Sequence, residues 1–326
     1  MSRRWTNQRG IALIIVLLMI SIIIAVTLQL NRSSRSEIYE AANFSDSVQL
    51  RSIAESGFYA GEAILLSDRN QFDALTELWA NTELLALKSE ALFENGSFKL
   101  AIEDEGGKLA INGLVKDGKF NDTVKDLLSR LLTGAYFRLD QRKADDLLAA
   151  IKDWIDTDDE VTGSGGAEGA YYAGLAHPYA VKNAPLDCIE ELLMVKGVST
   201  ELFYGTADSP GLVQCLTVFG DGKININTAP KPVLLALATG MTAKEVALFE
   251  EYRRDERNNL SDGLWYQKVL QPTGVAISPG IVIKVMSDTF RVTAIGLKGR
   301  LAEKITGLVK RDADRKKIRL LSWKVE

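Results

Sequence analysis

The sequence predicts an α+β fold in which a long N-terminal helix packs on a small antiparallel sheet and a large α-helical domain is inserted into that sheet. Three observations support this prediction. An apolar stretch near the N-terminus continues into a helical pattern, and strand-like alternation occurs once near residue 100 and three times near the C-terminus. Helical periodicity dominates the residues between these strands.

The N-terminal apolar stretch is long enough to cross a membrane. No charged residue lies between Arg9 and Arg32, and residues 11–30 span ~30 Å as a helix, about the thickness of the hydrocarbon core. Arg3, Arg4 and Arg9 precede the stretch, and basic residues favour the cytoplasmic side. We therefore predict a single-pass membrane protein with a short cytoplasmic N-terminus and an extracytoplasmic body.

After the membrane, helical periodicity continues through residues 36–66 without proline. Gly57 and Gly61 lie one turn apart there and would let a sheet approach closely. A second helix is predicted for residues 72–93, and residues 97–103 alternate as a strand.

The sheet partners of that strand are predicted at the C-terminal end of the chain. Residues 289–295, 301–309 and 317–325 read as strands, with turns at 296–299 and 311–314. Residues 107–286 separate them from the first strand and show the i, i+3, i+4 rhythm of helices, for example at 124–132 and 144–155. A helical domain inserted into a sheet explains this order.

Acidic residues crowd one predicted helix end and the loop that follows it. Residues 162–169 form that loop, which would return Glu168 toward the acidic run at Asp153, Asp156, Asp158, Asp159 and Glu160. Calcium takes six to eight oxygen ligands from flexible loops. We expect calcium at Asp156, Asp158 and Glu168, with Asp159 as a further ligand; a solvated acidic loop is the alternative.

The calcium loop is not an EF-hand. Counted from Asp156, the sixth residue is Val161 rather than glycine and the twelfth is Ala167 rather than glutamate.

The chain has two cysteines, Cys188 and Cys215. A disulfide would close a loop of about 27 residues and stabilise the fold by about 3 kcal/mol. Two separately buried thiols are the alternative.

Enzymatic activity is not expected from this sequence. The single histidine is His177, and neither cysteine has the spacing of a metal-binding motif. Residues 193–199 and 237–242 resemble helix-hairpin-helix turns, but Ser199 and Thr242 replace the second glycine of the versions that bind DNA. We therefore expect no nucleic-acid partner.

The N-terminus resembles the class III leader of type IV pilins and type II secretion pseudopilins. Gly10 lies between the basic leader and Ile11, where a prepilin peptidase would cut and methylate the new N-terminus. An uncleaved signal anchor is the alternative. The fifth mature residue is Ile15, where most members of the superfamily carry glutamate, and this departure resembles the minor pseudopilin K family of type II secretion.

Four further landmarks resemble that family, in the family's order. They are Asp153-Trp154-Ile155-Asp156-Thr157-Asp158, Gly166-Ala167-Glu168, Asn183-Ala184-Pro185-Leu186 with Glu191-Leu192, and Ile224-Asn225-Ile226-Asn227-Thr228-Ala229-Pro230. The resemblance implies a pilin-like fold with an inserted helical domain that binds calcium. It divides the chain into a leader (1–10), membrane helix (11–30), pilin-like helix and first strand (31–106), inserted domain (107–286) and closing strands (287–326).

Removal of the leader would take three arginines and no acid. The remaining 36 basic and 43 acidic residues then give a formal charge of −7, compared with −4 for the whole chain. A negative body does not favour nucleic-acid binding.

The resemblance implies a minor pseudopilin at the tip of a periplasmic pseudopilus, where it would initiate or cap assembly. Its partners would be other minor pseudopilins, the major pseudopilin, the prepilin peptidase and the inner-membrane secretion platform. Two alternatives remain open: a tip pilin of a type IV pilus, and an uncleaved membrane-anchored calcium-binding receptor.

Overall fold

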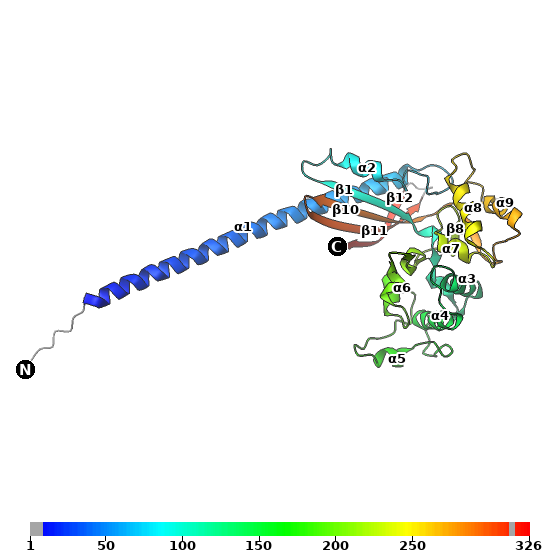
Figure 1. Ribbon diagram of the computed structural model, residues 1–326, viewed down its shortest axis with the longest axis horizontal. Coiled ribbons are helices and arrows are strands. Elements are labelled where there is room, and N and C mark those ends of the chain that lie inside the picture. The colour runs from blue at the N-terminus through cyan, green and yellow to red at the C-terminus, as the bar shows by residue number, and fades with distance from the viewer. Residues whose placement is uncertain (1–8, 313–316) are drawn as a thin grey trace, which may run out of the picture.

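The computed structural model describes residues 9–312 and 317–326. Most of the predicted leader, residues 1–8, and residues 313–314 of the second predicted turn lie outside the described residues. A long helix projects from a mixed α/β head (Figure 1). The predicted α+β architecture is confirmed.

The first helix, α1 (Arg9–Ser67), is continuous from the membrane stretch into the head. It contains the one segment in the described chain that is long and apolar enough to cross a membrane, and none of that segment's apolar window is buried within the head. The second half of α1 buries one face against the sheet, at Leu50, Ile53, Ala54, Phe58 and Leu65.

Gly57 and Gly61 allow α1 to approach the sheet closely, as predicted. A β-carbon at Gly57 would lie 2.9 Å from Phe98, and one at Gly61 would lie 2.9 Å from Val292. Their role is therefore packing within the subunit.

The main sheet has four antiparallel strands in the order β1-β10-β11-β12. They are β1 (Ser97–Asp104), β10 (Thr289–Lys298), β11 (Leu301–Asp312) and β12 (Lys317–Val325). The prediction of one early strand beside three late ones is confirmed. The predicted turn at 296–299 is too long, because Gly296–Lys298 pair within the sheet and only Gly299 and Arg300 separate β10 from β11.

The predicted helix at 72–93 is wrong in length, because only α2 (Glu83–Ser89) is helical there. Local side chains bind the backbone of residues 73–82 and hold it in turns. The Glu77 carboxylate accepts hydrogen bonds from the Ala74 amide and the Trp79 indole, while the Asn81 amide group donates to Leu75 and Glu77 carbonyls. These bonds compete with helical hydrogen bonding.

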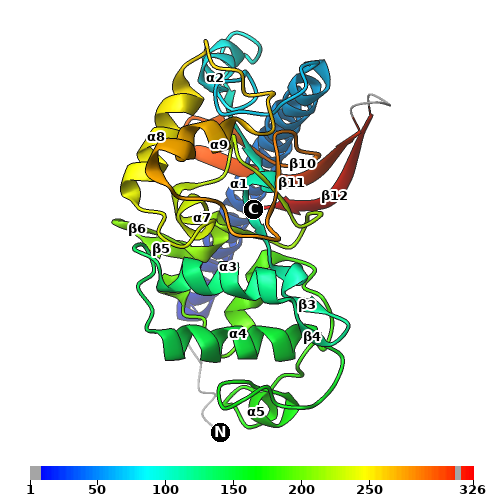
Figure 2. The same ribbon diagram turned by 90° about the vertical axis from the view of Figure 1, so that its right-hand side faces the viewer.

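Helices are the main regular elements of the inserted domain, but most of its residues lie outside α-helices, in loops, turns and short strands, so the prediction of a mostly helical region is confirmed only in part. The domain also has short strand pairs that the sequence analysis missed. Its helices are α3 (Asp122–Thr133), α4 (Gln141–Ile155), α5 (Gly169–Ala173), α6 (Thr200–Tyr204), α7 (Lys231–Ala236), α8 (Ala243–Arg254) and α9 (Trp265–Leu270). Short 3-10 turns are η1 (Glu105–Gly107), η2 (Ile111–Leu114), η3 (Ile189–Met194), η4 (Leu212–Gln214) and η5 (Gln271–Thr273). α3 and α4 run side by side, with α5 beyond them (Figure 2).

Four two-stranded pairs complete the inserted domain. β2 (Leu109–Ala110) pairs with β7 (Leu216–Thr217), β3 (Val115–Lys116) with β4 (Lys119–Phe120), β5 (Gly205–Thr206) with β6 (Ser209–Pro210), and β8 (Lys223–Asn225) with β9 (Val282–Lys284).

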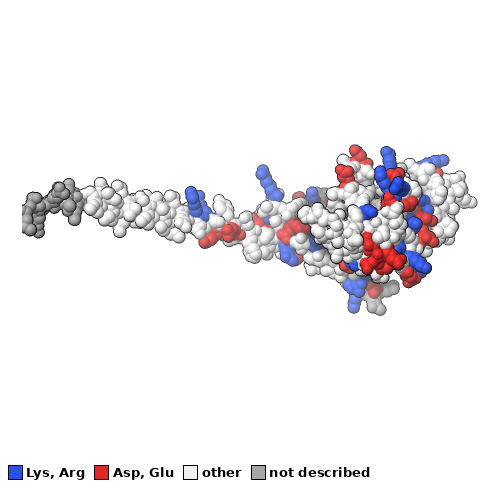
Figure 3. All heavy atoms as spheres, turned by 90° about the horizontal axis from the view of Figure 1, so that it is seen from below, with Lys and Arg blue, Asp and Glu red and all other residues white. Residues whose placement is uncertain are grey.

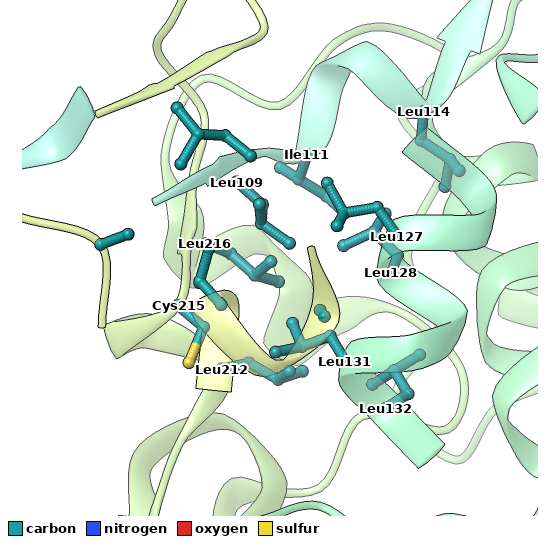
Figure 4. Close-up of a cluster of buried hydrophobic side chains, with 14 of the residues drawn as sticks. Leu109, Ile111, Leu114, Leu127, Leu128, Leu131, Leu132, Leu212, Cys215 and Leu216 are labelled. Atoms are coloured by element: carbon teal, nitrogen blue, oxygen red, sulfur yellow. The ribbon is translucent and has the colours of Figure 1, made fainter. Parts of the chain in front are cut away.

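The described chain has two large apolar cores. One lies between α1 and the main sheet, and the other fills the inserted domain, where leucines from α3 meet residues of the β2 and β7 segments (Figure 4). The short strands of the inserted domain could not be predicted from the sequence, because two or three residues are too few to show an alternating pattern.

A buried polar network joins the two cores. Asp104, at the end of β1, accepts hydrogen bonds from the side chains of Asn225, Thr228 and Ser287 at 2.9, 2.6 and 2.7 Å. Asn225 also donates to the Asp73 backbone carbonyl. The inserted domain is therefore fastened to the sheet by directional bonds.

Candidate functional site

The acidic segment lies at the C-terminal end of α4 and in the loop that leads to α5. Helix α4 places Asp153 and Asp156 one turn apart, and the loop returns Glu168 to them. Ligand atoms of these three residues lie within 4.8 Å of one another, and all three residues are buried. From the side where α5 lies, acidic side chains gather on the surface of the head (Figure 3).

Tight loop packing makes this convergence possible. A β-carbon at Gly166 would lie 2.2 Å from the Asp153 carboxylate and 2.7 Å from the Thr162 amide. Lys196 ties the loop down from the opposite side by donating to the carbonyls of Gly165 and Gly166 at 3.0 and 3.1 Å. Glycine is therefore required at Gly166 of this landmark, because Asp153 and Thr162 leave no room for a β-carbon.

Hydrogen bonding divides the three carboxylates into different roles. Asp153 accepts bonds from the Thr162 and Ala167 amides. Asp156 pairs with Lys152 through one oxygen, and its other oxygen has no partner in the described chain. Both carboxylate oxygens of Glu168 are buried there without any partner.

Burial, and then the neighbouring charges of Asp153 and Asp156, raise the pKa of Glu168 to about 7. Burial also raises the pKa of Asp156, although the Lys152 ammonium opposes the shift. Buried carboxylates without donors are costly unless they are protonated or bind a cation. Three buried oxygens without donors in the described chain, beside the Asp153 carboxylate, fit a hard divalent cation such as calcium.

The structure brings together two of the four predicted ligands. Asp156 and Glu168 belong to the buried group, whereas Asp158 and Asp159 are exposed on the adjoining loop. Asp158 accepts a bond from the Glu160 amide, and Asp159 accepts one from the Asn183 side chain. Asp153 was missed as a member of this buried group, although its i, i+3 spacing from Asp156 places the two on one helix face.

The other landmark residues have structural roles. Lys182 pairs with Glu191, which also accepts bonds from the amides of Asp187 and Cys188. Asn227 is buried and accepts a bond from the Trp265 indole at 2.8 Å. These landmarks shape the inserted domain rather than form a second ligand cluster.

The predicted disulfide does not form. Cys188 and Cys215 are both free thiols, Cys188 being exposed and Cys215 buried. The Cys215 sulfur lies among apolar side chains such as Leu212 and Leu216 (Figure 4), and burial raises its thiol pKa to about 12. The alternative of separate thiols therefore holds, although only one of them is buried.

The two hairpin-like turns are present, and the residues that replace their second glycine act as helix caps. Ser199 caps α6 by accepting the Leu202 amide, and Thr242 caps α8 in a reciprocal pair with Glu245. Such caps stabilise short helices.

Proteins of type II secretion systems are similar to this chain in sequence. A family model for protein K of the type II secretion system matches residues 107–205, the first half of the inserted domain and its acidic loop. Type II secretion system protein K of Aeromonas hydrophila is 27% identical over 331 residues, covering 96% of each chain. The protein of the same name from Pseudomonas aeruginosa is 29% identical and covers 71% of this chain and 68% of its own.

The chain is similar to type II secretion system protein K over nearly its whole length. Together with the shared fold, these similarities support its identification as a minor pseudopilin of that system. Both relatives are named as components of the type II secretion system.

A solved structure shares the fold of this chain. A chain in the crystal structure of the GspK-GspI-GspJ complex from the type 2 secretion system of enterotoxigenic Escherichia coli matches with a TM-score of 0.66 and 16% identity, over 88% of this chain and 99% of that chain.

Proposed function

We propose that this minor pseudopilin occupies the tip of a periplasmic pseudopilus, where it initiates or caps assembly. The observation that carries the proposal is the position of the inserted domain, which lies at the end of the head away from the membrane stretch of α1 (Figure 1). A further subunit stacked beyond the head would collide with this domain. The acidic body and the single apolar helix fit a periplasmic head on an inner-membrane anchor.

The N-terminal residues support the same position. Processing after Gly10 would expose Ile11 as an N-methylated terminus. Ile15 then stands where most pilin-like subunits carry a glutamate that can neutralise the N-terminus of a neighbour. A subunit with no neighbour above it does not need that carboxylate.

The partners follow from the same proposal. The solved structure with this fold is a complex named for GspK, GspI and GspJ, so other minor pseudopilins are the expected direct neighbours. The major pseudopilin, the prepilin peptidase and the inner-membrane platform would act on the subunit during assembly.

We also infer that the acidic loop holds calcium. Asp153, Asp156 and Glu168 would supply the buried ligands, and the exposed Asp158 and Asp159 would add negative charge at the entrance. Calcium would neutralise the unpartnered oxygens and fix the loop of residues 162–169 against α4.

Intact mass of the membrane-extracted protein tests the proposed function first. A chain that starts at N-methylated Ile11 is the expected result. A chain that still carries residues 1–10 would overturn the pseudopilin assembly model and favour an anchored receptor. In a processed chain, tight binding of double-stranded DNA that weakens with salt would instead favour a type IV pilus tip.

A second experiment addresses the tip position. Deletion of the gene should reduce secretion and change the number or length of pseudopili when the major subunit is overproduced. Unchanged secretion and pseudopili would contradict a role in initiation or capping.

A further inference from the structure

Five exposed leucines face outward from the segment between α1 and β1. We name this exposed set the leucine face, and each member is at least 50% exposed: Leu75, Leu78, Leu84, Leu87 and Leu92. Elsewhere in the described head, beyond α1, no stretch of the same length carries more than two exposed large apolar residues. Clustered exposed apolar side chains mark interaction sites more often than single ones do.

The opposite side of this segment is fixed to the sheet. Trp79 and Ser89 are buried, and Phe290 packs edge-on against Trp79 with ring centroids 5.4 Å apart. Ser89 exchanges hydrogen bonds with the backbone of Phe98, and Thr82 donates to the Leu100 carbonyl. The leucines are therefore presented on a support that covers the edge of β1, and they have no place in the subunit's own core.

A lipid bilayer is too far away to cover the leucine face. Gly96, just beyond this face, packs against Ile53 of α1. The helix from Leu30 to Ile53 is continuous, and its 23 steps correspond to ~35 Å along an upright helix. The face therefore lies well outside a membrane that ends near Leu30.

The charges at the border of the face disfavour a second copy of this chain. Glu83, Glu90 and Glu94 are exposed there, against one base, Lys88. Two such borders brought together would repel. An apolar surface bordered by lysine or arginine would be complementary.

We propose that the leucine face docks a neighbouring pseudopilin subunit through an apolar surface bordered by basic residues. This inference rests on the proposed function, in which neighbouring pseudopilins are anchored in the same membrane. Their heads would then lie at a similar height and could reach the leucine face. It assigns the contact to the side of the head that carries α2, distinct from the inserted domain that would block stacking from above.

Co-purification from detergent-extracted membranes tests the proposal with the full-length chain. Leu84→Glu combined with Leu87→Glu should lower the recovery of the system's own pseudopilins, identified by mass spectrometry, at least tenfold. Leu264→Glu is the control, since it places a negative charge on an exposed leucine of the inserted domain. A melting temperature within a few degrees of the parent protein establishes that the double variant is folded.

Charge reversal provides an independent measurement. Glu83→Lys combined with Glu90→Lys should also reduce recovery, whereas Glu256→Lys, on an exposed loop, should not. Equal recovery with the leucine variants and the parent would overturn the proposal and leave the proposed function intact.

Three other outcomes would contradict either the proposed function or the proposed occupant of the leucine face. Failure of the parent protein to recover any pseudopilin would contradict the proposed function itself. Self-association of the purified chain that the leucine variants abolish would point to a second copy, and loss of vesicle binding in those variants would point to lipid. Either outcome would overturn the proposal.

Discussion

At the scale of single residues, the buried Glu168 carboxylate lowers the stability of the protein when no cation is bound. Its two carboxylate oxygens are buried with no donor in the described chain, beside Asp153 and Asp156. A negative charge in such a place destabilises the empty fold unless a cation accompanies it. The calcium proposal therefore makes its sharpest prediction at this residue.

Glu168→Gln should largely abolish stabilisation by calcium. A ligand at a hundred times its Kd stabilises a native protein by about 2.7 kcal/mol, so the parent should melt at a clearly higher temperature in calcium than in a chelator. The variant should show little shift, and its chelator-treated form should be at least as stable as the parent, because one of three facing charges is gone. Calorimetry measures both.

Glu160→Gln is the matched control for that experiment. Glu160 is exposed on the same loop and lies outside the buried group. An undiminished calcium shift in Glu168→Gln, or an equal loss in the control, would contradict the assigned ligand.

Asp104 predicts a pH dependence of stability. Burial raises the pKa of its carboxyl above the ordinary value of 3.8, although hydrogen bonds from Thr228, Ser287, Gly106 and Asn225 oppose the shift. The unfolded chain then loses its proton at lower pH than the folded one. The free energy of unfolding should fall as pH rises from about 4 through the raised pKa.

Asp104→Asn should flatten that part of the pH profile, since the amide does not titrate. Its overall stability should also drop, because the amide group cannot accept the same donors. Urea unfolding at a series of pH values gives the slope, and an identical slope in parent and variant would show that Asp104 is not its source.

At the scale of elements, α1 performs two tasks with one unbroken helix. Its first part is apolar on all sides, whereas its last turns bury one face and carry glycine where the sheet approaches. The contact geometry makes Gly57 sensitive to size. The nearest neighbour of an added β-carbon is the Phe98 ring, which cannot move without disturbing the sheet.

Gly57→Val should destabilise the head by about 1–3 kcal/mol, because overpacking exceeds the smaller gain in helix propensity. Ser56→Val, on the exposed side of the same turn, should change stability by less than about 0.5 kcal/mol. Thermal unfolding by circular dichroism compares them. A neutral Gly57→Val would mean that α1 does not press against the sheet at this point.

At the scale of the whole molecule, the two apolar cores should unfold in one transition only if the buried polar network between them is intact. Asn225 sits at that junction and donates to Asp73, Asp104 and Ser287 from one amide group. Removal of a partner from a buried polar group costs about 1–3 kcal/mol. The lost free energy would weaken the coupling between the two cores rather than the stability of either core.

Asn225→Ala should split or broaden the calorimetric transition, which we expect to be single in the parent. Asn112→Ala is the matched control, because in the part of the chain that the structure describes the Asn112 side chain bonds to Leu186 and Val218, both inside the inserted domain. It should lower the melting temperature without a second peak. One sharp transition in Asn225→Ala would show that apolar contacts alone couple the cores.

Patterns that repeat along the chain were readable from the sequence. The membrane stretch, the continuation of α1, the four strands of the main sheet and the helical character of the insertion all depend on local periodicity. Each appears in the structure near its predicted bounds. The acidic loop was also found, because clustered carboxylates and small loop residues are visible in order.

Only the tertiary structure decided which of these side chains meet. Asp153 joins Asp156 and Glu168, while Asp158 and Asp159 turn outward, because Gly166 and Lys196 fix the path of the loop. Cys215 is held in the core and Cys188 on the surface, so no disulfide forms. The helix predicted at 72–93 gave way to turns, because covering the β1 edge placed Trp79 and Thr82 inward. Periodicity reports on contacts along the chain, whereas these outcomes depend on contacts between residues far apart in it.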